Sequence, residues 1–226
     1  EWVFKTTDMY FVPSYEIKNR YVQKGMSPDI FRITGVPVSN KFICDKKIKS
    51  TKLRLLLMGG GRGLFDFDES FMHWLDEYLY EYKDRLDVTI VTGSNKKLYD
   101  NLTVKKPLHN IDVKGFVTNM SDLLKNYDLM LTKSGGATLF EAISSNTPII
   151  VKNPKVGQEI ENAKFIRDKG IGILYDNDED LKDIIKSLLN NELDSRVAFM
   201  DENITYFKTT IHPEKIGDYV FELLDN

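Results

Sequence analysis

A run of six residues, Leu53–Met58, limits most strongly what this chain can fold into. Its sequence, Leu-Arg-Leu-Leu-Leu-Met, is too apolar to alternate between a core face and a solvent face. Such a run is typical of a strand that helices cover on both sides. A loop and a helical stretch follow it, and this order recurs along the chain. The recurrence predicts an α/β fold with a doubly wound parallel sheet.

Similar apolar runs and helical patterns can be marked along most of the sequence. The predicted strands are residues 9–12, 31–34, 53–58, 88–91, 111–114, 129–132, 148–151 and 172–175. The predicted helices are residues 14–24, 68–82, 96–101, 120–126, 138–145, 159–169, 178–190 and 213–224.

The segment between residues 36 and 50 interrupts this order, because it is polar and basic and has no clear period. The 35 residues before it supply only two strands and one helix, too few to cover both faces of a sheet. We therefore expect residues 1–38 to be the remnant of an N-terminal domain, 39–51 to be an interdomain linker, and 52–226 to be a second domain. Apolar residues of the remnant, such as Phe11 and Ile33, should be partly exposed or covered by a partner chain.

Composition narrows the classes of function. The 226 residues carry a formal net charge of -3, a poor match for a nucleic-acid partner. The single cysteine, Cys44, can form no internal disulfide and suits a reducing compartment. The three histidines show no metal-ligand spacing, so we expect no metal. No run approaches the roughly 18 apolar residues of a membrane span, and the opening at Glu1 suggests a piece of a longer protein.

Ligands of open parallel sheets bind beyond the carboxyl ends of the strands, where loops lead into helices. One such loop, Gly59 to Gly63, directly follows the run described above and contains Gly60, Gly61 and Arg62. Glycines allow backbone amides to approach a phosphate closely. The loop lacks the lysine of a Walker motif and the third glycine of a dinucleotide motif. The alternative is a flexible turn between strand and helix.

A second loop contains Ser134, Gly135, Gly136 and Thr138. Small residues at a helix start leave its first amides free, and the helix dipole favours an anion there. Glu141 lies one turn later, where its carboxylate could accept hydrogen bonds from a ribose diol. Thr138 and Glu141 could equally form a capping box, and the two interpretations stay open from these residues alone.

Two further loops carry weaker signals. Gln158 and Glu159 stand at a loop–helix junction and could offer an amide and a carboxylate to sugar hydroxyls, although Glu is common in any first helical turn. Phe116 and Val117 follow a predicted strand and could flank a nucleobase, but such apolar pairs more often fill a core.

Taken in order, these segments resemble the donor-site signature of family 28 glycosyltransferases. The resemblance rests on Thr132-Lys133-Ser134-Gly135-Gly136-Ala137-Thr138-Leu139-Phe140-Glu141-Ala142, on Pro148, and on residues 154–163. Residues 8–12, 33–38, 55–63 and 114–117 also look like parts of that family, so the resemblance covers nearly the whole chain. Ser134 departs from it, since glycolipid synthases of the family often have proline there.

The resemblance implies the C-terminal half of a GT-B fold, which binds a UDP-sugar, and a role for each loop. Phe116 and Val117 would border the uracil, and Glu141 would hold the ribose. The diphosphate would lie between the loop after the first apolar run and the loop that precedes Glu141. The residues implied for the diphosphate are Gly60, Gly61, Arg62, Ser134, Gly135, Gly136 and Thr138. Gln158 and Glu159 would contact the donor sugar.

The implied activity is an inverting transfer of a hexose from a UDP-sugar to a membrane lipid, for which we expect diacylglycerol. The general base would lie in the N-terminal domain, so no catalytic residue is named. No metal or other cofactor is expected, and the full-length protein should be cytoplasmic and peripheral at the inner face of the plasma membrane. This chain alone should bind UDP but transfer no sugar. A UDP-sugar epimerase of the same fold and a non-catalytic nucleotide-sugar-binding module are the alternatives.

Overall fold

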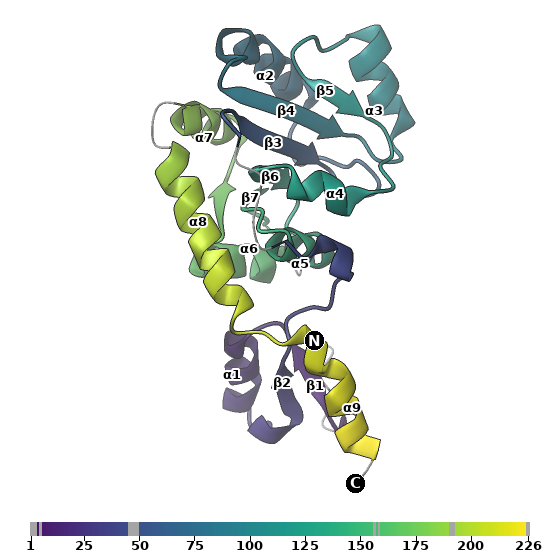
Figure 1. Ribbon diagram of the computed structural model, residues 1–226, viewed down its shortest axis with the longest axis vertical. Coiled ribbons are helices and arrows are strands. Elements are labelled where there is room, and N and C mark those ends of the chain that lie inside the picture. Colours follow the sequence, from purple (N-terminus) through teal and green to yellow (C-terminus); the bar gives the residue numbers. More distant parts are fainter. Residues whose placement is uncertain are drawn as a thin grey trace.

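Six parallel strands form the main sheet of the computed structural model, which describes residues 4, 6–44, 50–155, 157, 159–189 and 193–224 (Figure 1). The strand order is β5-β4-β3-β6-β7-β8. The bounds are β3 (Leu53–Met58), β4 (Leu86–Val91), β5 (Asp112–Lys114), β6 (Leu129–Thr132), β7 (Ile149–Lys152) and β8 (Gly172–Tyr175). The predicted α/β fold with a parallel sheet is confirmed.

Helices cover both faces of this sheet, as the apolar run in β3 predicts. Leu55 and Leu57 belong to the core on one face, whereas Leu56 and Met58 belong to the core on the other. The first face is covered by α2 (Glu69–Tyr82), α3 (Lys96–Asp100), its π-helical continuation η3 (Asn101–Lys105), and α7 (Asp178–Leu189). The second face is covered by α4 (Met120–Lys125), α5 (Gly136–Ser144) and α6 (Glu159–Asp168).

A long helix missing from the sequence prediction, α8 (Leu193–Lys208), connects these two layers. Its Met200 packs in the first core, while Ile204 and Phe207 pack in the second. The helix therefore passes from one face of the sheet to the other, beside β8 (Figure 1). Its buried residues recur at helical spacing, and this pattern is the signal that could have predicted it.

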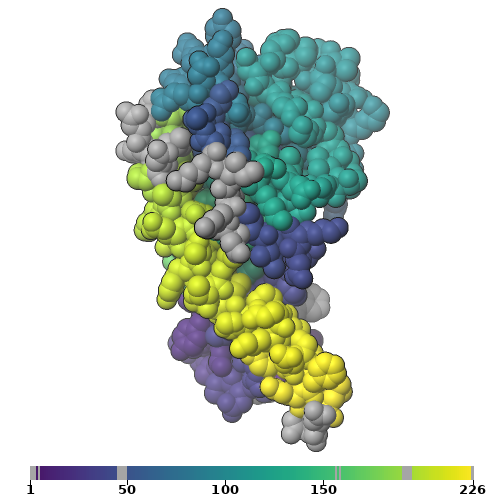
Figure 2. Space-filling model, in the orientation of Figure 1, coloured from purple at the N-terminus to yellow at the C-terminus, as the bar shows by residue number. Residues whose placement is uncertain are grey.

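A small second unit contains β1 (Tyr10–Val12) and β2 (Phe31–Ile33), a parallel pair, with α1 (Tyr15–Gln23) and the 3-10 turn η1 (Pro28–Ile30). After the 3-10 turn η4 (Pro213–Lys215), the last helix, α9 (Ile216–Leu224), returns to this unit. Figure 2 shows this yellow helix lying against the purple N-terminal segment. The Phe11 and Tyr219 rings lie 6.4 Å apart. Phe11 is nevertheless 36% exposed and Ile33 is partly buried, as expected, whereas the neighbouring Val12 and Phe31 are buried within the small unit.

The segment that leads from the small unit to the large one is held on the large one. It contains a 3-10 turn, η2 (Asn40–Phe42). The Ser145 hydroxyl donates to the Phe42 carbonyl at 2.9 Å, and the Cys44 amide donates to the Ser144 carbonyl at 3.0 Å. Lys208 Nζ donates to the Cys44 carbonyl at 3.1 Å. This part of the predicted linker is thus attached to the carboxyl end of α5.

Candidate functional site

The strand order places a topological switch point between β3 and β6. The chain moves from β3 to β4 and β5 on one side, and then continues at β6 on the other side of β3. Loops that leave neighbouring strands in opposite directions open a crevice at the carboxyl edge of a parallel sheet. The two glycine-containing loops singled out in the sequence follow β3 and β6, and therefore flank this crevice.

The loop after β3 is a braced turn. Gly60 and Gly63 have positive φ angles of 67° and 61°. A Cβ atom on Gly63 would lie 1.8 Å from the Thr92 carbonyl oxygen, so only glycine fits there. The Gly63 carbonyl accepts a hydrogen bond from Asn95 Nδ2 at 3.1 Å. Gly61 has open space at its Cβ position, and a ligand can approach the loop there.

The loop after β6 leads into α5 without a side-chain cap. The N-cap is Gly135, the helix begins at Gly136, and no described side chain caps its first turn. Thr138 therefore lies inside the helix, and the capping-box interpretation is wrong. The first amides of an α-helix have no partner within the helix, so this end of α5 is suited to an anion.

Asn162 of α6 fixes the position of this loop. Its Nδ2 atom donates to the carbonyl of the buried Ser134 at 2.7 Å, and it also lies 3.8 Å from the position of a Cβ atom on Gly136. Asn162 is a site residue that the sequence prediction did not select. Gly135 has open space at its Cβ position, so a ligand can approach the loop there.

Glu141 lies on α5, one turn beyond Thr138. Its side chain is partly buried, and burial raises the pKa of its carboxyl above the ordinary value of 4.5. Within the described part of the chain, no hydrogen bond or ion pair to this carboxylate is found. A partly buried carboxylate without a partner is costly to ionise. It is therefore well suited to accept hydrogen bonds from a ligand.

Phe116 and Val117, which follow Gly115 after the end of β5, have different surroundings. Phe116 is 68% exposed, so its ring is available to a ligand. Val117 packs against the second core and holds the loop in place. The sequence prediction gave both residues the same role, whereas in the structure the Phe116 side chain is exposed and that of Val117 is partly buried.

A polar pocket of about 320 Å³ lies beyond β7, on the other side of the crevice. It includes Glu159, the first residue of α6. The remaining residues that line it were not predicted as site residues: Asp66, Lys152, Asn153, Pro154, Lys155 and Asp176. The predicted contact Gln158 lies outside the described residues.

The sheet therefore gathers the predicted residues at one edge and in a definite order. The Phe116 loop follows β5, the Gly60 loop follows β3, the Ser134 loop follows β6, and the Glu159 pocket follows β7. Neighbouring strands lie about 4.8 Å apart, so these positions form a row of about 19 Å. An extended ligand with a base, a diphosphate and a sugar would meet these loops in that order, with the base at the Phe116 loop and the sugar at the Glu159 pocket.

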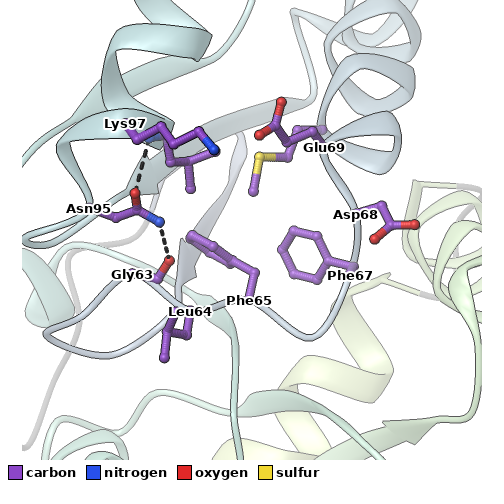
Figure 3. Close-up of a pocket in the computed structure, with 10 residues that line it drawn as sticks. Gly63, Leu64, Phe65, Phe67, Asp68, Glu69, Asn95 and Lys97 are labelled. Atoms are coloured by element: carbon purple, nitrogen blue, oxygen red, sulfur yellow. Dashed lines mark hydrogen bonds between the residues drawn. The ribbon is translucent and has the colours of Figure 1, made fainter.

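A second hollow, of about 340 Å³, lies between the end of the glycine loop and α3. Figure 3 shows Phe65 and Phe67 on its wall, with the Asn95–Gly63 hydrogen bond at one side. Gly63, at the end of the predicted glycine loop, lines this hollow, but none of the residues predicted to contact the donor does. No grouping of three or more potential metal-ligating side chains occurs in the described ranges. None of the described helices has the length and apolar character that crossing a membrane requires.

Comparison with known proteins agrees with this architecture. Among solved structures, MnaA of Staphylococcus aureus with UDP superposes with a TM-score of 0.65 at 19% identity, over 97% of this chain and 60% of that one. WaaG, a glycosyltransferase involved in lipopolysaccharide biosynthesis, superposes with a TM-score of 0.62 at 18% identity, over 96% of this chain and 62% of that one. The fold is that of the GT-B glycosyltransferases.

The sequence comparisons identify the family. The profile of the glycosyltransferase family 28 C-terminal domain matches residues 55–213, and the chain belongs to this family. It is 29% identical over 223 residues to the processive diacylglycerol beta-glucosyltransferase of Staphylococcus aureus (strain Newman). That match covers 93% of this chain and 56% of the relative, so the chain spans little more than half the relative's length.

Proposed function

We propose that this chain forms the donor site of an inverting glycosyltransferase that moves a hexose from a UDP-sugar to a membrane lipid, diacylglycerol. One observation carries the proposal. Glu141 presents a partly buried carboxylate for which the described residues supply no partner, in the second turn of α5, whose amino end is uncapped. A ribose diol would supply the missing donors while the diphosphate meets the helix end.

The arrangement suits the departure of a nucleoside diphosphate. Displacement at the anomeric carbon builds negative charge on the UDP leaving group. Amides fixed in advance at the α5 start and in the loop after β3 stabilise such charge where it develops. The hydrogen bonds from Asn95 and Asn162 hold the two loops in place before the ligand binds. No metal or other cofactor is required for this contribution, and we propose none.

The acceptor and the cellular location are proposed from the relatives. The staphylococcal relative is named as a diacylglycerol glucosyltransferase, and diacylglycerol resides in the membrane. We therefore place the complete enzyme in the cytoplasm, peripheral at the inner face of the plasma membrane. The domain boundaries at residues 38 and 52 remain part of this proposal, with the acceptor site and the general base outside this chain.

Family membership favours the transferase over an epimerase. A UDP-N-acetylglucosamine 2-epimerase shares the fold at a TM-score of 0.57 and 15% identity, which is evidence for the fold alone. The diacylglycerol glucosyltransferase is more similar in sequence and matches across nearly the whole chain.

Calorimetric titration of the chain with UDP, ADP and GDP tests the proposal. We expect UDP to bind at least about tenfold more tightly than either purine nucleotide, because the Phe116 loop and the adjacent backbone would read a pyrimidine edge. Equal affinity for all three nucleotides, or no binding of UDP, would contradict the donor-site assignment.

A further inference from the structure

The polar pocket beyond β7 has a wall that comes from a distant part of the chain. Its residues follow three different strands: Asp66 follows β3, Asn153 follows β7, and Asp176 follows β8. Its volume of about 320 Å³ lies at the lower end of the range for small-molecule sites. It therefore has room for one small polar group rather than for a large ligand.

Two lysines hold Asp66 in position. Lys133 Nζ lies 3.2 Å from Asp66 Oδ1, and Lys152 Nζ donates to the Asp66 backbone carbonyl at 2.7 Å. Lys133 directly precedes Ser134, so this ion pair joins the pocket to the loop at the start of α5. The Asp66 side chain remains 28% exposed. Its carboxylate is thus fixed by the protein while part of it is open to a ligand.

The charges around the pocket nearly balance. Three carboxylates, those of Asp66, Glu159 and Asp176, stand with the ammonium groups of Lys152 and Lys155, and Lys133 pairs with the first of them. Such a mixture of donors and acceptors suits hydroxyl groups. The balanced charges give an anionic sugar no net attraction, and a sugar carboxylate placed at Asp66 would bring two like charges together.

We infer that Asp66 is a specificity-determining residue of the donor site, where it accepts a hydrogen bond from a hydroxyl group of a neutral hexose bound in this pocket. The inference rests on the proposed function, because it requires the UDP portion to lie at α5. Asp66 approaches the sugar from the β3 side, whereas Glu159 approaches it from α6. A fixed acceptor discriminates between ligands, because one without the matching hydroxyl covers the carboxylate without supplying a donor to the oxygen that Lys133 does not contact.

Titration of the wild-type chain and Asp66→Asn with UDP, UDP-glucose, UDP-galactose and UDP-glucuronate tests this inference. The wild type should bind one of the two neutral UDP-hexoses more tightly than UDP, and should bind UDP-glucuronate more weakly than that hexose. Asp66→Asn should weaken the preferred UDP-hexose about tenfold or more, the effect of losing a hydrogen bond to a charged group. It should change UDP affinity less than about twofold and reduce the discrimination against UDP-glucuronate.

Two further variants distinguish the position of the Asp66 carboxylate from its charge and from any effect on folding. Asp66→Glu keeps the negative charge beside Lys133 but moves the oxygens, so it should lose most of the preference for the hexose. Asp68→Asn changes an exposed carboxylate two residues away, and asparagine is an equally good residue at the N-cap of α2. This control should bind every ligand as the wild type does, and urea melts of all variants should show a folded chain.

The outcomes distinguish this inference from the proposed function. If the wild type binds no UDP, the proposed function fails and the inference falls with it. If UDP binds but Asp66→Asn weakens UDP and UDP-hexose by the same factor, or weakens neither, the inference is wrong and the proposed function stands.

Discussion

Replacement of Glu141 by glutamine tests the donor site most directly, because it removes the charge and keeps the shape of the side chain. If the carboxylate accepts hydrogen bonds from both ribose hydroxyls, its loss should cost about 1.5–3 kcal/mol, the range for hydrogen bonds to a charged group. UDP affinity should then fall roughly ten- to hundredfold. The glutamine oxygen can still accept one neutral hydrogen bond, so alanine should reach the upper part of this range.

The assay is a calorimetric titration of the wild type and Glu141→Gln with UDP and with 2′-deoxy-UDP. The wild type should bind UDP more tightly than the deoxy compound. In the variant this difference should largely vanish, because the charged partner of the 2′-hydroxyl is already absent. The four affinities form a double-mutant cycle, which isolates the contact between the carboxylate and the 2′-hydroxyl. Glu77→Gln, an exposed glutamate on α2, is the matched control and should leave both affinities unchanged. A difference between the nucleotides that persists in Glu141→Gln would refute the ribose contact.

The same substitution has a predictable effect on the free chain. Burial raises the pKa of Glu141 above 4.5 in the folded state. Below this pH the carboxyl is protonated in both states, and above the raised folded pKa it is ionised in both. Between these limits the folded state binds more protons, so the free energy of unfolding falls as pH rises. Glu141→Gln should remove this fall and unfold at a urea concentration equal to or higher than that of the wild type near pH 7.

Three other predictions follow from the fold and the site. Gly63→Ala should lower the free energy of unfolding by about 2–5 kcal/mol in urea melts, because a Cβ there is strained and would collide with the Thr92 carbonyl; Gly61→Ala, in open space, should cost less than about 1 kcal/mol. Lys208→Met should lower the free energy of unfolding by about 1–3 kcal/mol, because the Cys44 carbonyl and its neighbours lose a charged donor. An unchanged urea midpoint for this variant would contradict the prediction. The whole chain, incubated with labelled UDP-glucose and diacylglycerol vesicles, should form no glycolipid, and detectable product would contradict the prediction.

The strands could be predicted from the sequence because each is a short apolar run between loop residues. All eight predicted strands are present, with ends that shift by no more than two residues. Helix α8 was missed although Val197, Met200, Ile204 and Phe207 follow helical spacing. Its exposed face also carries apolar side chains, among them Phe199 at 60% exposure, and these weaken the amphipathic pattern.

The candidate site was predictable only in part. The sequence showed that glycines and Glu141 follow predicted strands, but it left the capping box open, because that choice depends on whether α5 begins at Gly136 or at Thr138. Asp66 could not be selected, since its importance arises from Lys133, which is 67 positions away along the chain but only 3.2 Å away in the fold. Contacts of this kind depend on strand order, and strand order is not encoded in any local pattern.

The distribution of hydrogen bonds at the sheet edge explains why Glu141 should be the most informative residue. Gly63 is held by Asn95, Ser134 by Asn162, and Asp66 by its lysines. These loops are therefore in position before any ligand arrives, which lowers the entropic cost of binding. Glu141 is the exception in this row, because burial disfavours its charge and no described residue compensates for it. A ligand that donates hydrogen bonds there gains the contact and also relieves that cost. The carboxylate whose charge is disfavoured in the free chain should thus contribute strongly to nucleotide affinity.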